Sequence, residues 1–302
     1  MRWIDLLRPV MRLSPRQSIR LLGLLGAGWA DDAKWRSVQP RYRAYVDPVL
    51  KCLATVDLAE WGGRSCYYWG RFPDVAHQLL LCRVLKPGDT YIDVGANVGF
   101  HSMLASRLVG PSGVVLSFEP NPATFSILSG HMAINRIKNC RPFSFALGDV
   151  DGDATLNQIE IHSGTATLRA VNEPLNSVKV NVRRGDEIFK DIPFAGQTII
   201  KVDVEGFELQ VLRGLEKTLA RVAIVAVEIT PDWLAQQKAT PGEMVTYMQN
   251  LGFQAIVPRL TWRLGLFSPR LEFDPLTRIT KQTDVCFVRD TTNYLLPAHA
   301  RA

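Results

Sequence analysis

The chain has 302 residues, of which 47% are hydrophobic, enough to bury the core of one α/β domain with an N-terminal extension. Its formal net charge is +6, but residues 1–30 hold five arginines against Asp5 alone, so the rest carries only 6 − 4 = +2. This small remainder argues against a nucleic-acid-binding body, which would need a basic face of its own.

Residues 1–85 are predicted to form an extension and cap ahead of the main domain. Residues 21–30 are apolar but too few to span a bilayer, and the arginines before them predict at most weak contact with a membrane surface. Trp61–Gly70 has aromatic residues between glycines, as in a hairpin, and Asp74–Leu85 has the pattern of an amphipathic helix. The aromatic residues either stack on a sugar or planar substrate or fill a small core, and both interpretations stay open.

Thr90–Ser102 is predicted to be a buried strand that turns sharply into a helix. Asp93 places a carboxylate near the strand end, and the following turn, Gly95-Ala96-Asn97-Val98-Gly99, allows a ligand to approach the backbone closely. The glycine spacing differs from the G-x-G-x-x-G of dinucleotide-binding turns. It resembles instead the first motif of class I S-adenosylmethionine-dependent methyltransferases, in which this turn binds the cofactor.

Two further strands are predicted to end at the same site. Gly113–Glu119 ends in a carboxylate 24 residues past Gly95, near the offset of roughly 20 at which Rossmann-type folds place an acid on ribose hydroxyls. Glu119 is therefore the ribose candidate. The strand 140–146 leads to Asp149, which either meets the adenine amino group or serves as a turn residue.

After an insert of short strands, two more buried strands are predicted to end in carboxylates. Asp203 and Glu205 follow the strand 198–203, with Glu205 expected to open the next helix, and Glu228 ends the strand 222–228. Asp203, Glu205 and Glu228 are the candidates for a catalytic base, and sequence does not choose among them. A hard cation held by Asp203 and Glu228 is the alternative, but no dedicated oxygen-ligand loop is present, so no metal is expected.

The last two strands of the predicted sheet are 252–257 and 284–289. They are joined by a long segment, Arg259–Gln282, which is either a substrate-facing lid or a solvated loop with an apolar anchor. Its arginines and aromatic residues suit a glycan or an acidic metabolite.

Four segments in this order make the resemblance specific. Tyr91-Ile-Asp-Val-Gly-Ala-Asn-Val-Gly-Phe, Phe118-Glu-Pro-Asn-Pro, Ala146-Leu-Gly-Asp and Ile200-Lys-Val-Asp-Val-Glu-Gly-Phe-Glu resemble the FkbM family of methyltransferases. The resemblance implies O-methylation of a hydroxyl on a small metabolite or glycan, with S-adenosylmethionine as cofactor. It also implies a Rossmann-like class I methyltransferase fold, a seven-stranded and mostly parallel sheet whose last strand is antiparallel.

The predicted organisation is an extension and cap over 1–85, a methyltransferase domain over 86–290 and a tail over 291–302. An NAD-dependent oxidoreductase and a non-catalytic cofactor-binding scaffold are the alternatives. Five cysteines occur singly, without a C-x-x-C pair or zinc spacing, which favours a reducing, cytoplasmic location, with weak contact at the inner membrane surface as an addition.

Overall fold

A computed structural model describes residues 35–47, 50–70, 72–158, 164, 166–261 and 269–290. The predicted membrane-contacting segment in residues 1–30 and the predicted tail after residue 290 lie outside the described residues. Within the described part of the chain, no helix has the length and apolar character needed to cross a bilayer.

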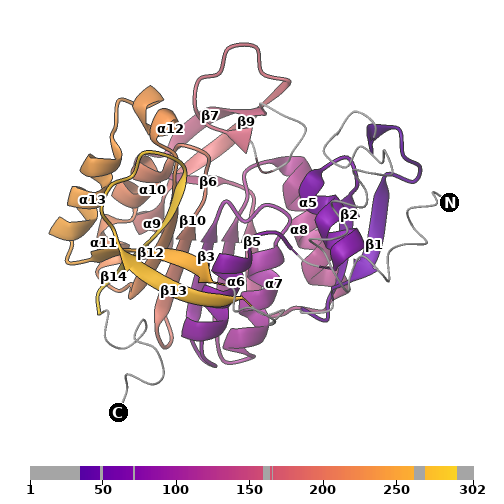
Figure 1. Ribbon diagram of the computed structural model, residues 1–302, viewed down its shortest axis with the longest axis horizontal. Coiled ribbons are helices and arrows are strands. Elements are labelled where there is room, and N and C mark those ends of the chain that lie inside the picture. Colours follow the sequence, from indigo (N-terminus) through magenta and orange to yellow (C-terminus); the bar gives the residue numbers. More distant parts are fainter. Residues whose placement is uncertain are drawn as a thin grey trace.

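An eight-stranded mixed sheet forms the centre of the molecule (Figure 1). Its order is β13-β12-β14-β11-β10-β3-β4-β5. The neighbours β11, β10, β3, β4 and β5 are parallel, and β14 is antiparallel to β11, as expected. In sheet order the strands span Arg270–Pro275, Gln254–Thr261, Thr283–Val288, Ile224–Ile229, Thr198–Val202, Thr90–Val94, Val114–Phe118 and Cys140–Phe143.

The prediction of seven strands was therefore wrong by one. The additional strand β13 lies inside the segment that was expected to be a lid or loop, and it pairs antiparallel with β12 along Ile256–Thr261. Arg259 stabilises this hairpin on its exposed side, because its guanidinium contacts Asp274 at 2.7 Å and Glu272 at 2.9 Å. The residues between the two strands, 262–268, lie outside the described part of the chain.

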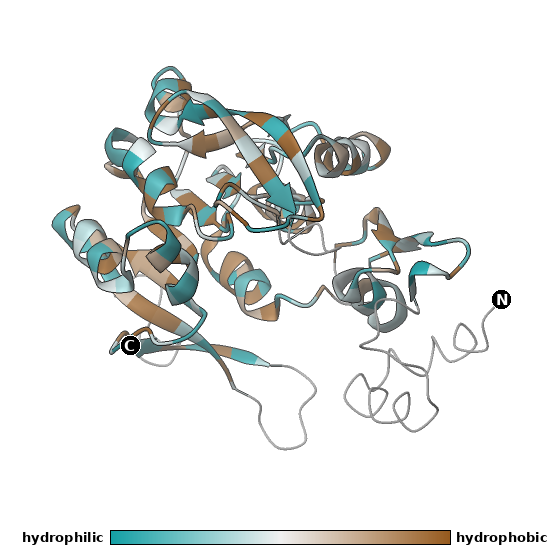
Figure 2. Cartoon of the chain, turned by 90° about the horizontal axis from the view of Figure 1, so that it is seen from above, coloured by the Kyte–Doolittle hydropathy of each residue, from teal (hydrophilic) through white to brown (hydrophobic). Residues whose placement is uncertain are grey.

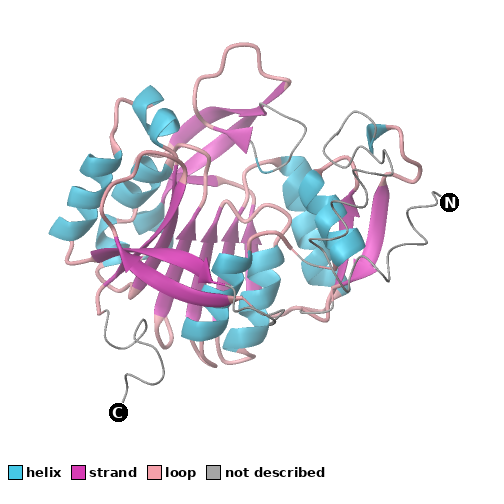
Figure 3. Ribbon diagram, viewed as in Figure 1, coloured by secondary structure: helices cyan, strands magenta, loops and turns pink. Residues whose placement is uncertain are grey.

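Helices cover both faces of the sheet (Figure 3). Alternation along the strands sends Tyr91 and Ile199 to one hydrophobic cluster and Ile92 and Ile200 to the other. The first cluster also contains residues of α6 (Val75–Val84), α7 (Phe100–Val109) and α8 (Pro122–Ile134). The second contains residues of α9 (Gly185–Phe189), α10 (Glu208–Gly214), α11 (Glu216–Leu219), α12 (Pro231–Gln236) and α13 (Pro241–Asn250). Figure 2 shows both hydrophilic and hydrophobic residues on these helices, consistent with one buried side each.

A second, four-stranded sheet packs beside the first in the order β6-β9-β7-β8. It is formed by Ala146–Gly148, Asn176–Arg184, Gly152–Gln158 and Ala166–Thr167, which confirms the strands predicted in the insert. The single strand expected over 140–146 was wrong, because the chain leaves the main sheet after Phe143 and enters the second sheet at Ala146. Gly148 then passes close to Gly214 at the end of α10. A Cβ on Gly214 would lie 1.8 Å from the carbonyl oxygen of Gly148.

The N-terminal cap is a hairpin followed by two short helices. The hairpin is β1 (Tyr42–Val46) and β2 (Leu53–Asp57), and the helices are α5 (Trp61–Arg64) and the π-helix η1 (Ser65–Trp69). The hairpin expected over Trp61–Gly70 was therefore wrong, since these residues are helical. Buried Arg64 explains this conformation, because it donates to the carbonyls of Leu58 and Ala59 and so ties the first helix to the chain before it.

Candidate functional site

A cavity of about 1350 Å³ opens at the carboxyl ends of the parallel strands. Its lining comes from the cap, the turn after β3, the ends of β4, β10 and β11, the second sheet and the C-terminal hairpin. Ligand pockets usually have volumes of about 300–1,000 Å³, so this cavity has room for a cofactor together with a second molecule.

The turn after β3 lines the cavity through Gly95, Ala96, Asn97 and Gly99. Gly95 has φ +80°, and a Cβ there would lie 1.8 Å from the carbonyl oxygen of Asp203. Gly99 has φ +88°, and its Cβ would meet the Leu128 side chain at 2.3 Å. Both positions therefore require glycine, as the predicted close turn implied.

Asp93 lies beneath this turn rather than in the cavity wall. It is fully buried, and its Oδ2 accepts a hydrogen bond from the Ser102 hydroxyl at 2.6 Å. Burial raises the pKa of Asp93. Its second oxygen, Oδ1, has no hydrogen-bond partner among the described residues. The structure therefore places Asp93 in support of the turn and out of direct reach of the cavity.

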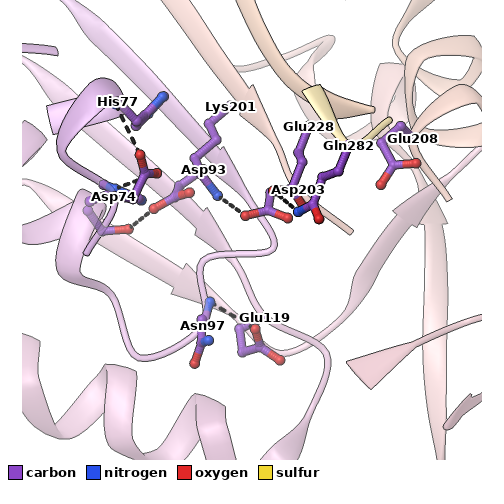
Figure 4. Close-up of polar contacts among 12 residues, drawn as sticks. Asp74, His77, Asp93, Asn97, Glu119, Lys201, Asp203, Glu208, Glu228 and Gln282 are labelled. Atoms are coloured by element: carbon purple, nitrogen blue, oxygen red, sulfur yellow. Dashed lines mark hydrogen bonds and ion pairs between the residues drawn. The ribbon is translucent and has the colours of Figure 1, made fainter. Parts of the chain in front are cut away.

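Glu119 lines the cavity beside the turn, as predicted. Its carboxylate accepts the backbone N–H of Asn97 at 2.9 Å (Figure 4). It also accepts the backbone N–H of Asn121 at 2.8 Å. Burial raises the pKa of Glu119 to about 7, although these two hydrogen bonds act to lower it. Asp149 is half-buried and is absent from the cavity lining, which favours its alternative interpretation as a turn residue.

The three predicted catalytic carboxylates meet at the other end of the cavity. One oxygen from each of Asp203, Glu205 and Glu228 lies within 4.8 Å of the others. Lys201, buried in β10, donates to Asp203 at 2.7 Å, and Gln282 donates to Glu228 at 2.6 Å (Figure 4).

These carboxylates share one electrostatic environment. Burial raises the pKa of Glu205 to about 9 and that of Glu228 to about 8, with the charge of Asp203 adding to both shifts. Burial lowers the pKa of Lys201, but the charges of Asp203 and Asp93 outweigh this effect and raise it. We therefore expect Lys201 to be charged and Glu205 and Glu228 to be mostly protonated near neutral pH.

Glu205 does not open a helix, contrary to the prediction. It has φ +56°, and α10 begins only at Glu208. Its carbonyl oxygen accepts hydrogen bonds from Thr167 Oγ1 at 2.7 Å and Arg169 Nε at 2.8 Å. Two residues of the second sheet and its following loop thus hold the left-handed backbone of Glu205.

Several residues in the cavity wall were not identified from the sequence. They are Asp74, His77, His101, Lys201, Gln282 and Asp284. His101 lies two residues after Gly99, and Lys201 lies two residues before Asp203, so proximity to a motif was the available signal for both. The other four come from segments distant in sequence, and only the fold brings them to the cavity.

The residues present fit S-adenosylmethionine. The glycine turn admits a close ligand, Glu119 offers a carboxylate beside it, and the three acids offer polar oxygens at the other end of the cavity. Glu205 Oε2 is buried without a hydrogen-bond partner among the described residues, so a polar group is expected to meet it when a ligand binds.

Comparison with known proteins gives the family. The model of the methyltransferase FkbM domain matches residues 93–255, which is more than half of the chain. The hexuronic acid methyltransferase AglP of Haloferax volcanii is 31% identical over 150 residues, covering 50% of this chain and 59% of that protein. The 31-O-demethyl-FK506 methyltransferase FkbM of Streptomyces tacrolimicus is 25% identical over 201 residues, covering 57% of this chain and 75% of that protein.

Among solved structures, a methyltransferase FkbM from Methylobacillus flagellatus is similar with a TM-score of 0.41 and 14% identity, covering 75% of this chain and 53% of that one. The family match favours methyl transfer over the alternative of an NAD-dependent oxidoreductase. The chain belongs to the FkbM family of methyltransferases and uses S-adenosylmethionine as its cofactor.

Proposed function

We propose that this enzyme methylates a hydroxyl oxygen of a sugar or of another hydroxyl-rich small molecule. The observation that carries the proposal is the convergence of Asp203, Glu205 and Glu228 at one end of the cavity. Carboxyl groups accept hydrogen bonds from hydroxyls, so this end of the cavity favours an acceptor with several of them. The names of two relatives, one for hexuronic acid and one for 31-O-demethyl-FK506, support an oxygen acceptor.

We further propose that Gly95, Ala96, Asn97, Gly99 and Glu119 hold the cofactor, with Asp93 supporting the turn from below. S-adenosylmethionine supplies an electrophilic methyl group on a positively charged sulfur. Gly95 packs against the backbone carbonyl of Asp203, so the turn lies beside the backbone of the segment that begins the carboxylate cluster. This contact supports placing the reacting methyl group between them.

The carboxylates then have two tasks in this proposal. They accept hydrogen bonds from the acceptor, and they align its reacting hydroxyl with the methyl group. Closing the acceptor into the cavity also excludes water from the reaction.

The direct test is product analysis with cofactor labelled in its methyl group with carbon-13. We expect the enzyme to form a labelled methyl ether on one of a panel of p-nitrophenyl glycosides that includes a glucoside and a glucuronide, as detected by NMR. Label on nitrogen or carbon in an acceptor panel of amines and enols, with none on oxygen, would refute the proposal.

Substitutions test the carboxylates themselves. We expect Asp203→Asn and Glu228→Gln to lower turnover by about 10²-fold, the scale of a misaligned reacting group, with a much smaller change in cofactor affinity. Glu187→Gln is the control, since Glu187 is an exposed carboxylate on α9 that pairs with Lys190. Equal losses in turnover and affinity would instead make Asp203 and Glu228 cofactor-binding or folding residues.

A further inference from the structure

A histidine and an aspartate form a pair on the wall of the cavity contributed by α6 and α7. His101 is the second residue of α7, and Asp74 is the N-cap of α6. His101 Nε2 lies 3.3 Å from Asp74 Oδ2. Both residues line the cavity that contains the glycine turn and the carboxylate cluster.

Neighbouring side chains fix the orientation of the imidazole. The ring of His101 packs edge-on against Phe72 at 5.1 Å and against His77 at 4.6 Å between centroids. His101 is only 7% exposed. Its Nε2 is buried 3.3 Å from Asp74 Oδ2 and makes no hydrogen bond among the described residues. Because a nearby carboxylate favours the protonated nitrogen, we expect the proton on Nε2 and the lone pair on Nδ1.

Charged and titratable groups face His101 from three elements. Asp74 and His77 come from α6, and Lys201 comes from β10. Tyr91 of β3 contacts His77, with 2.9 Å between the Tyr91 hydroxyl and His77 Nε2. Burial and the charge of Lys201 lower the pKa of His101, against a hydrogen bond to the Asp74 backbone. The imidazole is therefore neutral near neutral pH, which is the form that accepts a proton.

The carboxylate cluster is less suited to accepting that proton. Glu205 and Glu228 have pKa values raised to about 9 and about 8, so each mostly carries its own proton near neutral pH. Asp203 is occupied by Lys201 at 2.7 Å. Methyl transfer to a hydroxyl nevertheless releases a proton, and a neutral imidazole in the same cavity can take it.

We propose that His101 is the general base of the reaction and that Asp74 positions it. In the step, a lone pair of the acceptor oxygen forms the new bond to the methyl carbon, and the carbon–sulfur pair stays with sulfur. The hydroxyl proton passes to His101 Nδ1. Asp74 stabilises the resulting imidazolium until the proton is lost to water after product release.

This inference rests on the proposed oxygen acceptor, and its first test needs no acceptor. NMR of protein labelled with nitrogen-15 in histidine reports the tautomer of His101, assigned by comparison with His101→Ala. We expect the Nε2–H tautomer near neutral pH, with and without S-adenosylhomocysteine. A protonated Nδ1, or a charged ring, would overturn the proposal whatever the acceptor is.

The second test uses the glycoside that the wild-type enzyme methylates. We expect His101→Ala to lower turnover by about 10²–10⁴-fold, the usual contribution of general base catalysis, with S-adenosylhomocysteine affinity within about threefold of wild type. Added imidazole is expected to restore part of the turnover. A residue with only a structural role would lose stability or affinity together with turnover and would gain nothing from imidazole, and that outcome would overturn the proposal.

Asp74 offers a matched pair of variants because it also caps α6 through His77 N–H at 3.1 Å. Asn and Ser are both good N-caps, so Asp74→Asn and Asp74→Ser keep the helix and remove the charge beside His101. We expect both to lower turnover about tenfold, and to lower the pKa on the acid limb of the turnover–pH profile, at unchanged melting temperature. Wild-type turnover in both variants would remove Asp74 from the proposal.

Discussion

At the scale of single residues, Gly95 connects the two halves of the site. Its φ of +80° is a conformation that other residues rarely adopt, and the space for a Cβ is filled by the carbonyl of Asp203. The turn that we propose to hold the cofactor is thus built directly against the residue that begins the carboxylate cluster.

Replacing Gly95 with Ala is expected to disturb both the cofactor turn and the segment of Asp203 that packs against it. We expect a loss of stability of more than about 1 kcal/mol in urea unfolding and a loss of S-adenosylhomocysteine affinity in calorimetry. Gly130→Ala is the matched control, because Gly130 lies in α8 with nothing within 4 Å of the position that a Cβ would take, and it should be neutral or stabilising by about 0.5–1 kcal/mol. Wild-type affinity in Gly95→Ala would contradict the placement of the cofactor at this turn.

Glu119 gives a prediction for pH. Its pKa is raised to about 7 by burial, so lowering the pH through 7 adds a proton and removes the charged acceptor of the proposed ribose hydroxyls. We expect affinity for S-adenosylhomocysteine to fall as the pH drops from about 8 to about 6. Glu119→Gln should bind more weakly at high pH, by roughly 1.5–3 kcal/mol, and lose this pH dependence. Calorimetry from about pH 6 to about pH 8 tests this prediction. If the affinity of the variant changed with pH as steeply as that of the wild type, the pH dependence would belong to another group.

At the scale of elements, the second sheet supports the carboxylate cluster. Thr167 in β8 is completely buried, and its hydroxyl donates to the carbonyl of Glu205 while accepting from the backbone N–H of Arg169 at 3.1 Å. Arg169 packs over the Trp233 ring at 4.8 Å, so the loop after β10 is held between the second sheet and α12.

Thr167→Val is expected to weaken this connection without changing the volume of the side chain. Loss of the buried hydroxyl should reduce the free energy of unfolding by about 1–3 kcal/mol and lower turnover, because the Glu205 backbone is less firmly held. Thr155→Val, at an exposed position on β7 of the same sheet, is the control and should change neither quantity. A Thr167→Val enzyme with wild-type stability and turnover would show that Arg169 alone suffices.

At the scale of the whole molecule, the cap is joined to the catalytic domain through α8. Asn135 exchanges two hydrogen bonds of 2.8 Å with the backbone of Leu53, and His131 Nε2 accepts Thr55 N–H at 2.9 Å. The Nδ1 of His131 contacts the carbonyl of Val98 in the glycine turn at 2.8 Å. The cap hairpin and the turn therefore share one helix as their support.

Stability of the ligand-free enzyme is expected to fall as the pH rises from about 6.5 to about 8.5. In this window the pKa values of Glu119 and Glu208 are raised to about 7, and those of Glu228 and Glu205 to about 8 and about 9. The folded state thus binds more protons than the unfolded state, in which these groups are already ionised. The buried histidines have lowered pKa values and are neutral in the folded state, but they are partly protonated in the unfolded state near about pH 6.5. They therefore oppose the trend at the low end of the window, where the four carboxyl groups outweigh the three histidines.

Melting temperatures at constant ionic strength test this prediction. The melting temperature should fall less steeply with pH in Glu228→Gln, because this variant has no proton to lose at position 228. A melting temperature that rises over the same window would mean that ionisation of these carboxyl groups is not costly in the folded protein.

The sequence by itself determined the order of the core strands along the chain, the glycine turn with Asp93 and Glu119 at strand ends, and the grouping of Asp203 with Glu228. Local patterns carry this information, because parallel strands bring their carboxyl ends to one edge whatever the details of packing. The tertiary structure decided the rest. It added β13 and divided the strand expected over 140–146, since strand pairing depends on partners distant in the chain. It also brought Asp74 to His101 and Arg169 to Glu205, contacts between segments that no local pattern relates.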